Sequence, residues 1–588
     1  MLGAIAVFAI DFVLGVSGWI SWVLTIAEGA AALPWAWAVL GKFRANELAL
    51  SQRASTRVWS RAWIATTRLR AALVGAGFVL LLFGALGLKV VLLASGGWNA
   101  ADLTHLYRTY LAMAVFIAAL GWAGRGQRAL WFFGQVAARP ARMLPMSVLV
   151  VSLLGAFLLA TPFALTDPTK GSFIDALFDA TGALCGALSI SDVGRHYQFF
   201  GQLVILALMQ IGGFGIMVLS ASIVILSQRR LEVKSSARFA EVVDADNLAD
   251  VRATVFRIIL WTVAIEALGA IALYFLFDVP GIAAHAQDPH PLAGGGGPLW
   301  SAVFHSVSAF CNAGFSLFRG NLAPFVADPA VNGVICALII LGGLGFPVLS
   351  ELALRAVDFL LRRPRKRLSL HARVVLTMTG ALVIVGALSI GMVEWGHSLQ
   401  KLPIGGKVLG AVFQSVTART AGYSSVDFAE MTAPGLLLMV ALMFVGAGPG
   451  STGGGIKVTT LAVLFATFRA EQTAAPAPSL FGREIPQSIQ RKAIVVTFLS
   501  ALLVVSSVFL LLLFEDAPPL HALFEVTSAF ASVGCSTGIE SKMGAAGKLV
   551  LVATMMIGRV GPLTFALAAA GNPRATTYRL PEERVMIG

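Results

Sequence analysis

One eight-residue pattern occurs four times in this chain of 588 residues, and it constrains the fold more than any other feature. The pattern is A-[LV]-F-x-x-[VT]-[GST]-A, and its copies begin at Ala176, Ala302, Ala411 and Ala522. The closing alanines are 126, 109 and 111 residues apart. Four matches at near-equal spacing indicate internal duplication.

Composition decides the environment of these repeats. Apolar residues make up 57% of the chain and charged residues 12%, and a soluble fold cannot cover that much apolar surface. We therefore expect an all-α polytopic membrane protein, which excludes a nucleic-acid binder, a secreted disulfide scaffold and a disordered chain. Apolar runs long enough to cross a bilayer lie near 4–24, 72–94, 108–123, 146–163, 202–227, 256–277, 333–353, 374–394, 435–467, 492–514 and 547–571.

Each copy of the pattern lies between two of these runs and is too short to span the bilayer. A half-helix of about 12 residues covers only half of the hydrocarbon thickness. Irregular backbone at that depth is tolerated only where protein buries it or water reaches it. We therefore expect four span–pore-helix–span repeats around one central pore; the alternative is four buried core helices in a non-conducting protein. The predicted regions are an N-terminal set of extra transmembrane helices (1–145) and pore repeats at 146–230, 231–365, 366–475 and 476–588, the last with a cytoplasmic tail.

A glycine follows the closing alanine by four or five positions in three repeats, at Gly314, Gly422 and Gly534. Glycine accepts positive φ, so the chain turns there and aims carbonyl oxygens inward. A ring of such carbonyls replaces the water shell of a monovalent cation. In the first repeat the order is different: either Gly186 takes this role in a shorter loop, or Ala187 or Leu188 supplies the carbonyl.

A glycine-rich stretch interrupts the apolar run at 435–467. Residues 448–455 contain five glycines and one proline, and such a stretch does not stay helical. Unwound backbone in mid-span has to line a cavity, and we expect a plug that moves aside. Charges within the runs are few: Glu266 and Glu351 fit a packing or a functional role equally well, and Arg559 is the clearest intramembrane cation.

The net charge of +13 is carried by short loops between apolar runs, such as Arg362-Arg363-Pro364-Arg365-Lys366-Arg367. The positive-inside rule assigns these loops to the cytoplasm. We expect a multi-pass protein of the cytoplasmic (inner) membrane with a cytoplasmic C-terminus. Most of these charges are solvated loop charges, and anionic lipid or an acidic cytosolic subunit is a second possibility.

These motifs, with Gln210-Ile211-Gly212-Gly213-Phe214-Gly215 and Gly558-Arg559-Val560-Gly561-Pro562, resemble the Trk/Ktr/HKT superfamily of potassium transporters, over about residues 145–572. The resemblance implies K⁺ uptake through a carbonyl-lined filter, gated by an intramembrane loop that an arginine faces. It also implies a homodimer with a separate cytosolic, nucleotide-binding RCK-type subunit. We expect no catalytic residues, no cofactor in this chain, no nucleic-acid partner and no metal other than K⁺ at the filter.

The resemblance assigns the site residues as follows. The filter comprises Gly186, Ala187, Asn312, Ala313, Gly314, Thr420, Ala421, Gly422, Ser532, Val533 and Gly534. The gate comprises Gly448, Gly450, Ser451, Thr452, Gly453, Gly454, Gly455 and Arg559. The irregular first filter segment leads us to expect weaker discrimination of K⁺ from Na⁺. The alternatives are a symporter that couples K⁺ to H⁺ or Na⁺, and a non-conducting regulatory homologue.

Overall fold

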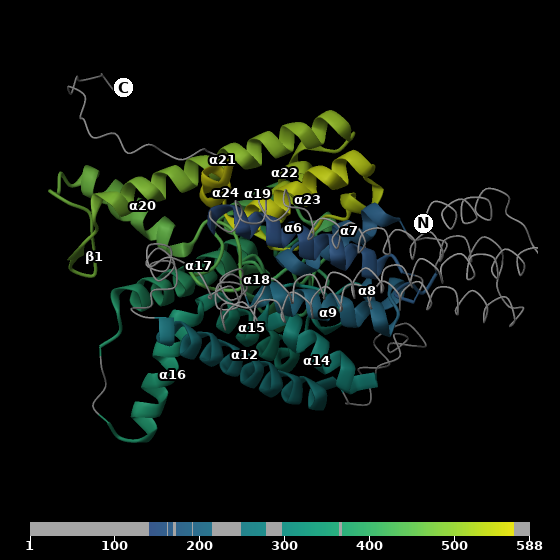
Figure 1. Ribbon diagram of the computed structural model, residues 1–588, viewed down its shortest axis with the longest axis horizontal. Helices are drawn as coiled ribbons and strands as arrows, with labels where there is room; N and C mark the ends of the chain where they lie inside the picture. Colours follow the sequence, from purple (N-terminus) through teal and green to yellow (C-terminus); the bar gives the residue numbers. More distant parts are fainter. Residues whose placement is uncertain are drawn as a thin grey trace, which may run out of the picture.

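The computed structural model describes residues 140–161, 163–167, 172–190, 192–214, 248–277, 297–363 and 367–569. The expected extra helices of residues 1–145 and the end of the tail lie outside the described residues, apart from the first turns of α6. The described part is almost entirely helical (Figure 1). The expectation of an all-α protein is confirmed for it.

The helices fall into four consecutive groups. The first holds α6 (Pro140–Leu159), α7 (Phe173–Cys185), α8 (Val193–His196) and α9 (Phe199–Gly213). The second holds α12 (Leu248–Phe277), α14 (Gly297–Phe310), α15 (Pro329–Leu344) and α16 (Phe346–Leu360), with the 3-10 turn η2 (Ala323–Phe325). The third holds α17 (Leu370–Glu394), α18 (Ile404–Thr417), η3 (Phe428–Glu430), α19 (Ala433–Phe444) and α20 (Val458–Gln472). The fourth holds α21 (Gln487–Phe514), α22 (Pro519–Ala531), η4 (Ile539–Lys542), α23 (Ala545–Val560) and α24 (Pro562–Ala569), preceded by a small hairpin of β1 (Ser479–Leu480) and β2 (Arg483–Glu484).

The long helices have the length and the surface of membrane spans. Among the described residues, Arg257–Phe277, Leu370–Glu394 and Gln487–Phe514 are each long and apolar enough to cross a bilayer. α21 exposes large apolar side chains, with Phe498 at 66% and Phe509 at 67%. An apolar surface of this extent indicates contact with lipid.

Two apolar runs that the sequence analysis treated as single spans are broken. The run at 333–353 is divided between α15 and α16, which are bent by 110° at Gly345. The run at 547–571 is broken at Gly561, between α23 and α24. Both glycines have positive φ, 91° and 92° respectively, a conformation that stops a right-handed helix. The break predicted at the glycine-rich stretch is present between α19 and α20.

The four short helices that carry the repeated pattern form the interior of the protein. They are α7, α14, α18 and α22, of 13 or 14 residues each. The phenylalanine of each pattern copy is fully buried, at most 1% exposed, and the four are Phe178, Phe304, Phe413 and Phe524. The repeated pattern therefore reflects packing: each short helix buries a phenylalanine at the same position of the pattern.

The packing of the short helices is cyclic. Each contacts the second apolar helix of the preceding group: α14 packs on α9, α18 on α15, α22 on α19, and α7 on α23. The salt bridge between Lys548 Nζ of α23 and Asp175 of α7, 2.6 Å long, joins the last group to the first. The four short helices thus follow one another in a closed order of contacts.

Candidate ion filter and gate

The chain that follows each short helix turns sharply. In the last three groups two residues per turn have positive φ: Asn312 and Gly314, Thr420 and Gly422, Ser532 and Gly534. The sequence analysis singled out the glycines for this property and missed it in Asn312, Thr420 and Ser532. Asparagine at a helix end is a known signal for the left-handed conformation, while threonine and serine give no such signal.

These four turns contact one another in a closed order. A Cβ atom built on Gly314 would lie 2.6 Å from the carbonyl oxygen of Ala421, and one built on Gly422 would lie 2.4 Å from that of Val533. One built on Gly534 would lie 3.1 Å from the carbonyl oxygen of Ala187, and one built on Gly186 would lie 2.7 Å from that of Asn312. Side chains at these four positions would collide with the neighbouring loop. The four loops therefore form a ring in which each glycine lies against a backbone carbonyl of the next loop.

The first turn has a different backbone from the other three. Only Gly186 has positive φ there (66°), and Leu188, two residues further on, lacks the positive φ that Gly314, Gly422 and Gly534 have at this place. The carbonyl oxygen of Leu188 lies 1.9 Å from the Cβ position of Gly182, on the side of its own helix. Among the three alternatives of the sequence analysis, the carbonyl of Ala187 lies beside the fourth loop, and that of Leu188 is turned away from it.

One polar residue of each short helix holds the chain beyond the ring, and it always follows the buried phenylalanine. Asp179 accepts hydrogen bonds from Ile190 N–H (2.9 Å) and Ser189 Oγ (3.0 Å). His305 Nδ1 lies 2.7 Å from the carbonyl of Ser301, so Nδ1 donates, and Nε2 accepts from Leu317 N–H (3.4 Å). These residues brace the segment that leaves the ring.

The equivalent braces of the third and fourth groups differ in strength. Gln414 Nε2 donates to Ser425 Oγ (3.2 Å), a single bond. Glu525 Oε1 accepts from Thr537 N–H (2.7 Å), Thr537 Oγ1 (2.8 Å) and Ser536 Oγ (2.9 Å). Ser536 also bonds to the buried Glu540. The sequence analysis took no account of Asp179 and Gln414, although their shared position in the repeated pattern was a signal for them.

The glycine-rich loop between α19 and α20 lies directly below the ring. The Cβ position of Gly453 is 2.1 Å from Thr420 Oγ1, and that of Gly454 is 2.6 Å from Ser532 Oγ. Thr452 Oγ1 donates to the carbonyl of Phe310 at the end of α14 (3.3 Å). The loop therefore contacts the turns of three groups, and side chains at its glycines would not fit.

Hydrogen bonds between the two ends of the loop close its base. Gly446 N–H donates to the carbonyl of Ile456 (2.9 Å), and Lys457 Nζ donates to the carbonyl of Gly453 (2.7 Å). Ser451 Oγ donates to the carbonyl of Gly448 (2.6 Å). Its outer part bonds to the second group, since Gly448 N–H donates to the carbonyl of Gly343 (2.9 Å).

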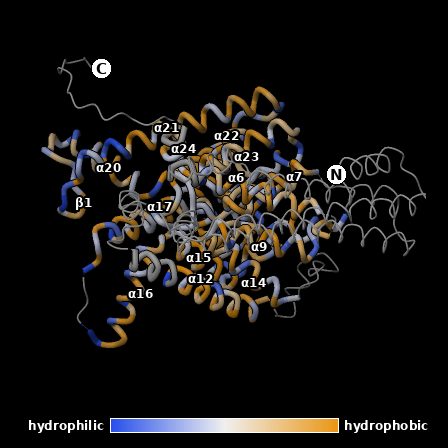
Figure 2. Tube along the Cα trace, in the orientation of Figure 1, coloured by the Kyte–Doolittle hydropathy of each residue, from blue (hydrophilic) through white to orange (hydrophobic). Residues whose placement is uncertain are grey.

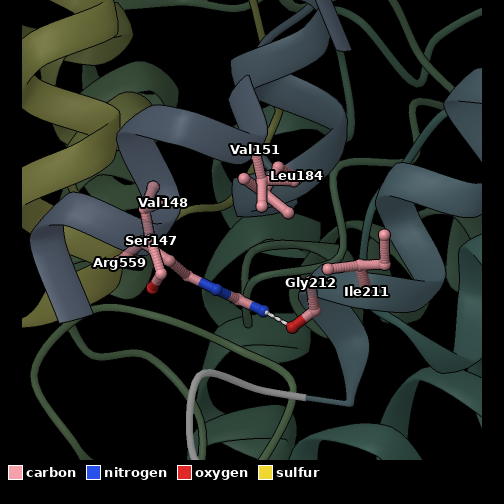
Figure 3. A pocket seen from close by; sticks show the side chains of 7 residues that line it. All are labelled: Ser147, Val148, Val151, Leu184, Ile211, Gly212 and Arg559. Atoms are coloured by element: carbon pink, nitrogen blue, oxygen red, sulfur yellow. Dashed lines mark hydrogen bonds between the residues drawn. The ribbon is translucent and has the colours of Figure 1, made fainter. Parts of the chain in front are cut away.

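Arg559 of α23 connects this loop with the first group. Its guanidinium donates one hydrogen bond to the carbonyl of Thr452 and one to the carbonyl of Gly212 at the end of α9. Figure 3 shows the side chain reaching across a pocket to Gly212. The pocket is lined by Ser147, Val148, Val151, Leu184, Ile211, Gly212 and Arg559. Thus all four groups meet at the loop, directly or through Arg559.

The other charged residues of the apolar runs have partners. Both carboxylate oxygens of Glu266 accept from Gln210 Nε2 (3.2 and 3.1 Å). Glu351 accepts from Ser369 N–H and Ser369 Oγ, both at 2.7 Å. In the described ranges, His, Cys, Asp and Glu side chains form no group of three or more that could hold a metal ion.

The fold defines a class: a helical membrane protein whose four short helices with the repeated pattern are buried. The profile of the TrkH family, described as cation transport protein, matches residues 128–578. The chain therefore belongs to the TrkH family of cation transport proteins, which is a transporter family and not an enzyme class. The expected membership in the Trk/Ktr superfamily is confirmed.

Curated relatives match about three quarters of the chain. The Ktr system potassium uptake protein B of Vibrio alginolyticus is 35% identical over 453 residues, 76% of this chain and 94% of that protein. The potassium/sodium uptake protein NtpJ of Enterococcus hirae is 33% identical over 457 residues, 76% of this chain and 97% of that protein. The crystal structure of the potassium transporter TrkH from Vibrio parahaemolyticus has the same fold, with a TM-score of 0.57 at 19% identity, over 85% of this chain and 98% of that one.

Proposed function

We propose that this chain takes up K⁺ across the membrane through a filter made of backbone carbonyls. The observation that carries the proposal is the closed order of contacts among the four turns, in which each glycine lies against a carbonyl of the next loop. The C-terminal ends of the four short helices, which carry partial negative charge, lead into this ring. Carbonyl oxygens and helix dipoles without a fixed carboxylate suit a monovalent cation. The relatives named as potassium uptake proteins support the same ion.

The proposed architecture is four span–pore-helix–span repeats around one pore, with the boundaries given in the sequence analysis. The cyclic packing of α7, α14, α18 and α22 supports it. The proposed filter residues are those of the four turns, 186–187, 312–314, 420–422 and 532–534. In the first turn we assign the filter carbonyl to Ala187, whose oxygen lies beside Gly534.

The proposed gate is the loop 448–455 with Arg559. A glycine-rich loop directly below the filter blocks the pathway, and it has few side chains to obstruct its movement. Arg559 holds it in this position through the carbonyl of Thr452. We propose that opening requires this hydrogen bond to break.

We further propose that discrimination of K⁺ from Na⁺ is weaker than in a ring of four glycine turns. Leu188, two residues after Gly186, does not adopt the left-handed backbone that Gly314, Gly422 and Gly534 share at this place. One of four carbonyls is then presented at a different angle, which changes the size and the symmetry of the ion site.

We also propose three features from the sequence: the oligomeric state, the partner and the location in the cell. They are a homodimer, a separate cytosolic nucleotide-binding subunit of RCK type, and an inner-membrane location with the basic loops and the C-terminus in the cytoplasm. The name of the Vibrio alginolyticus relative, a protein of a Ktr system, supports a multi-component system.

Complementation tests the transport proposal. The chain is expressed in a cell that lacks its own potassium uptake and is grown at low external K⁺. Restored growth, with accumulation of K⁺ or Rb⁺, is the expected result. Absence of growth in spite of membrane expression would favour a non-conducting regulatory homologue.

A further inference from the structure

In the second group of helices, α15 is followed directly by α16, which runs in a different direction. α15 and α16 meet at an angle of 110° at Gly345. With α15 taken as the part of this pair that follows the span direction, a segment bent by this angle runs close to the membrane plane. In Figure 1 α16 projects from the body at the end of the molecule where α20 and the β1–β2 hairpin also lie.

α16 has two chemically different sides. Leu354, Val357 and Leu361, spaced three and four residues apart, form an exposed apolar stripe, and Leu360 next to it is 77% exposed. The other side carries charges at the same helical spacing: Glu351, Arg355 and Asp358. Figure 2 shows the outer end of α16 alternating between hydrophobic orange and hydrophilic blue. This pattern is typical of helices that lie in the interface between water and lipid.

The outer end of α16 is basic. Arg362 and Arg363 follow it directly, and both are exposed. Arginines at the level of the headgroups are attracted to an anionic lipid surface. Because the apolar stripe would enter the acyl chains while the arginines stay at the headgroups, the partner that fits this surface is an anionic phospholipid leaflet.

The inner end of α16 is joined to the glycine-rich loop. Phe346 N–H donates to the carbonyl of Gly450 (3.0 Å). The Cβ position of Gly345 lies 2.4 Å from the carbonyl oxygen of Pro449, and that of Gly450 lies 3.2 Å from Pro347 Cδ. Since there is no free space between the two segments, a tilt of α16 displaces the loop.

Glu351 supplies a second attachment, one turn further along α16. Its carboxylate accepts from the N–H and the hydroxyl of Ser369, and this hydroxyl in turn accepts from Ala372 N–H at the start of α17 (3.1 Å). The helix is thus fixed at the loop and at α17, and both of these attachments lie in its inner half, before Leu354.

We propose that α16 is an interfacial lever that binds anionic headgroups of the adjacent leaflet and biases the glycine-rich loop. This inference rests on the proposed role of the loop as the gate, and it adds a regulator, the lipid composition, that acts on the gate from outside the pore.

The first test locates α16 without using transport. A bimane fluorophore is attached to Leu360→Cys in the full-length protein in liposomes, and the labelled wild type is the blank for the native cysteines. Nitroxide-labelled lipids should quench the fluorophore, and aqueous iodide should not. Quenching by iodide alone would overturn the inference. Protection from both quenchers would also overturn it, because the face would then be covered by protein such as a second copy.

The second test measures the lipid response. Rb⁺ flux is compared between vesicles of phosphatidylcholine and vesicles that also contain phosphatidylglycerol. We expect the flux to differ about threefold or more between the two lipid compositions, because the arginines at the end of α16 are attracted to the anionic surface. The double variant R362Q/R363Q should lose most of this difference, and the matched variant R483Q/R491Q, which removes two exposed arginines at the same end, should keep it.

Two results of the second test would contradict the inference: a wild-type flux that does not depend on the lipid, or an R362Q/R363Q variant that responds as the wild type does. A protein without flux in any lipid would refute the transport proposal, and with it the coupling to the gate. The position of α16 would still be decided by the quenching experiment.

Discussion

Arg559 donates a hydrogen bond to the backbone carbonyl of Thr452, 107 residues earlier in the chain. A second hydrogen bond, to the carbonyl of Gly212, fixes the same guanidinium to the first group of helices. The position of the loop below the ring therefore depends on a side chain from the last group, and on backbone atoms from the first.

Loss of this contact should favour the open state. Hydrogen bonds that involve a charged group contribute about 1.5–3 kcal/mol, and about 1.4 kcal/mol corresponds to tenfold in an equilibrium. We expect Arg559→Ala to raise the basal Rb⁺ flux by about tenfold when the protein is measured without other subunits. Arg491→Ala, an exposed arginine outside the pore, is the control. An unchanged flux in Arg559→Ala would argue against the latch.

Gly422 should not tolerate a side chain. Its Cβ position lies 2.4 Å from the carbonyl oxygen of Val533, and the φ of 77° is unfavourable for any other residue. We expect Gly422→Ser to reduce K⁺ flux by at least about tenfold, because a strain of 1–3 kcal/mol is added at the ring. Gly405→Ser in the same group is the control, since its Cβ position has no atom within 4 Å. Equal loss in both variants would indicate a general folding defect.

Ala187→Gly should increase the preference for K⁺. Without the Cβ atom, residue 187 gains backbone freedom, so its carbonyl beside Gly534 can take the direction of the carbonyls in the other turns. The expected result is a higher ratio of Rb⁺ to Na⁺ flux in liposomes, by about threefold or more, the effect of about 0.7 kcal/mol between the two ions. Ala176→Gly, at a buried alanine of α7, the helix before this turn, should leave the ratio unchanged. If both variants behave as the wild type, the first turn does not control selectivity.

The braces behind the ring should differ in importance. Glu525→Ala removes the acceptor of three hydrogen bonds, and Gln414→Ala removes the donor of one. Each buried group left unpaired costs about 1–3 kcal/mol. We therefore expect a larger drop of the melting temperature, in detergent, for Glu525→Ala than for Gln414→Ala. The reverse order would mean that these bonds do not hold the turn.

The repeated pattern was enough to predict the buried half-helices, because a short apolar segment between two spans has few other places to go. It was not enough to predict the bend at Gly345. That bend depends on the carbonyl of Pro449, which lies more than a hundred residues further along the chain. Long-range contacts of this kind leave no local signature, and the apolar run at 333–353 looks continuous.

In the proposed filter turns, prediction from the sequence is limited in the same way for single residues. Glycine is a visible signal for positive φ, so Gly314, Gly422 and Gly534 could be found. In the first turn the sequence left three alternatives, because the direction of a carbonyl depends on what surrounds it. In the structure the carbonyl oxygen of Leu188 lies against Gly182, and the carbonyl oxygen of Ala187 lies beside Gly534. These neighbours, which are the basis for proposing the carbonyl of Ala187, are not visible in the sequence.

The central claim is that backbone carbonyls of four turns form a filter for K⁺, and ion flux through the purified protein tests it most directly. The protein is reconstituted in liposomes, and the uptake of Rb⁺ and Na⁺ is measured at a clamped voltage, with and without a pH gradient. We predict uptake of Rb⁺ that follows the voltage, exceeds that of Na⁺, is independent of the pH gradient and is lost in Gly422→Ser but kept in Gly405→Ser. Uptake that needs the pH gradient, or no alkali-ion flux at all, would contradict the account.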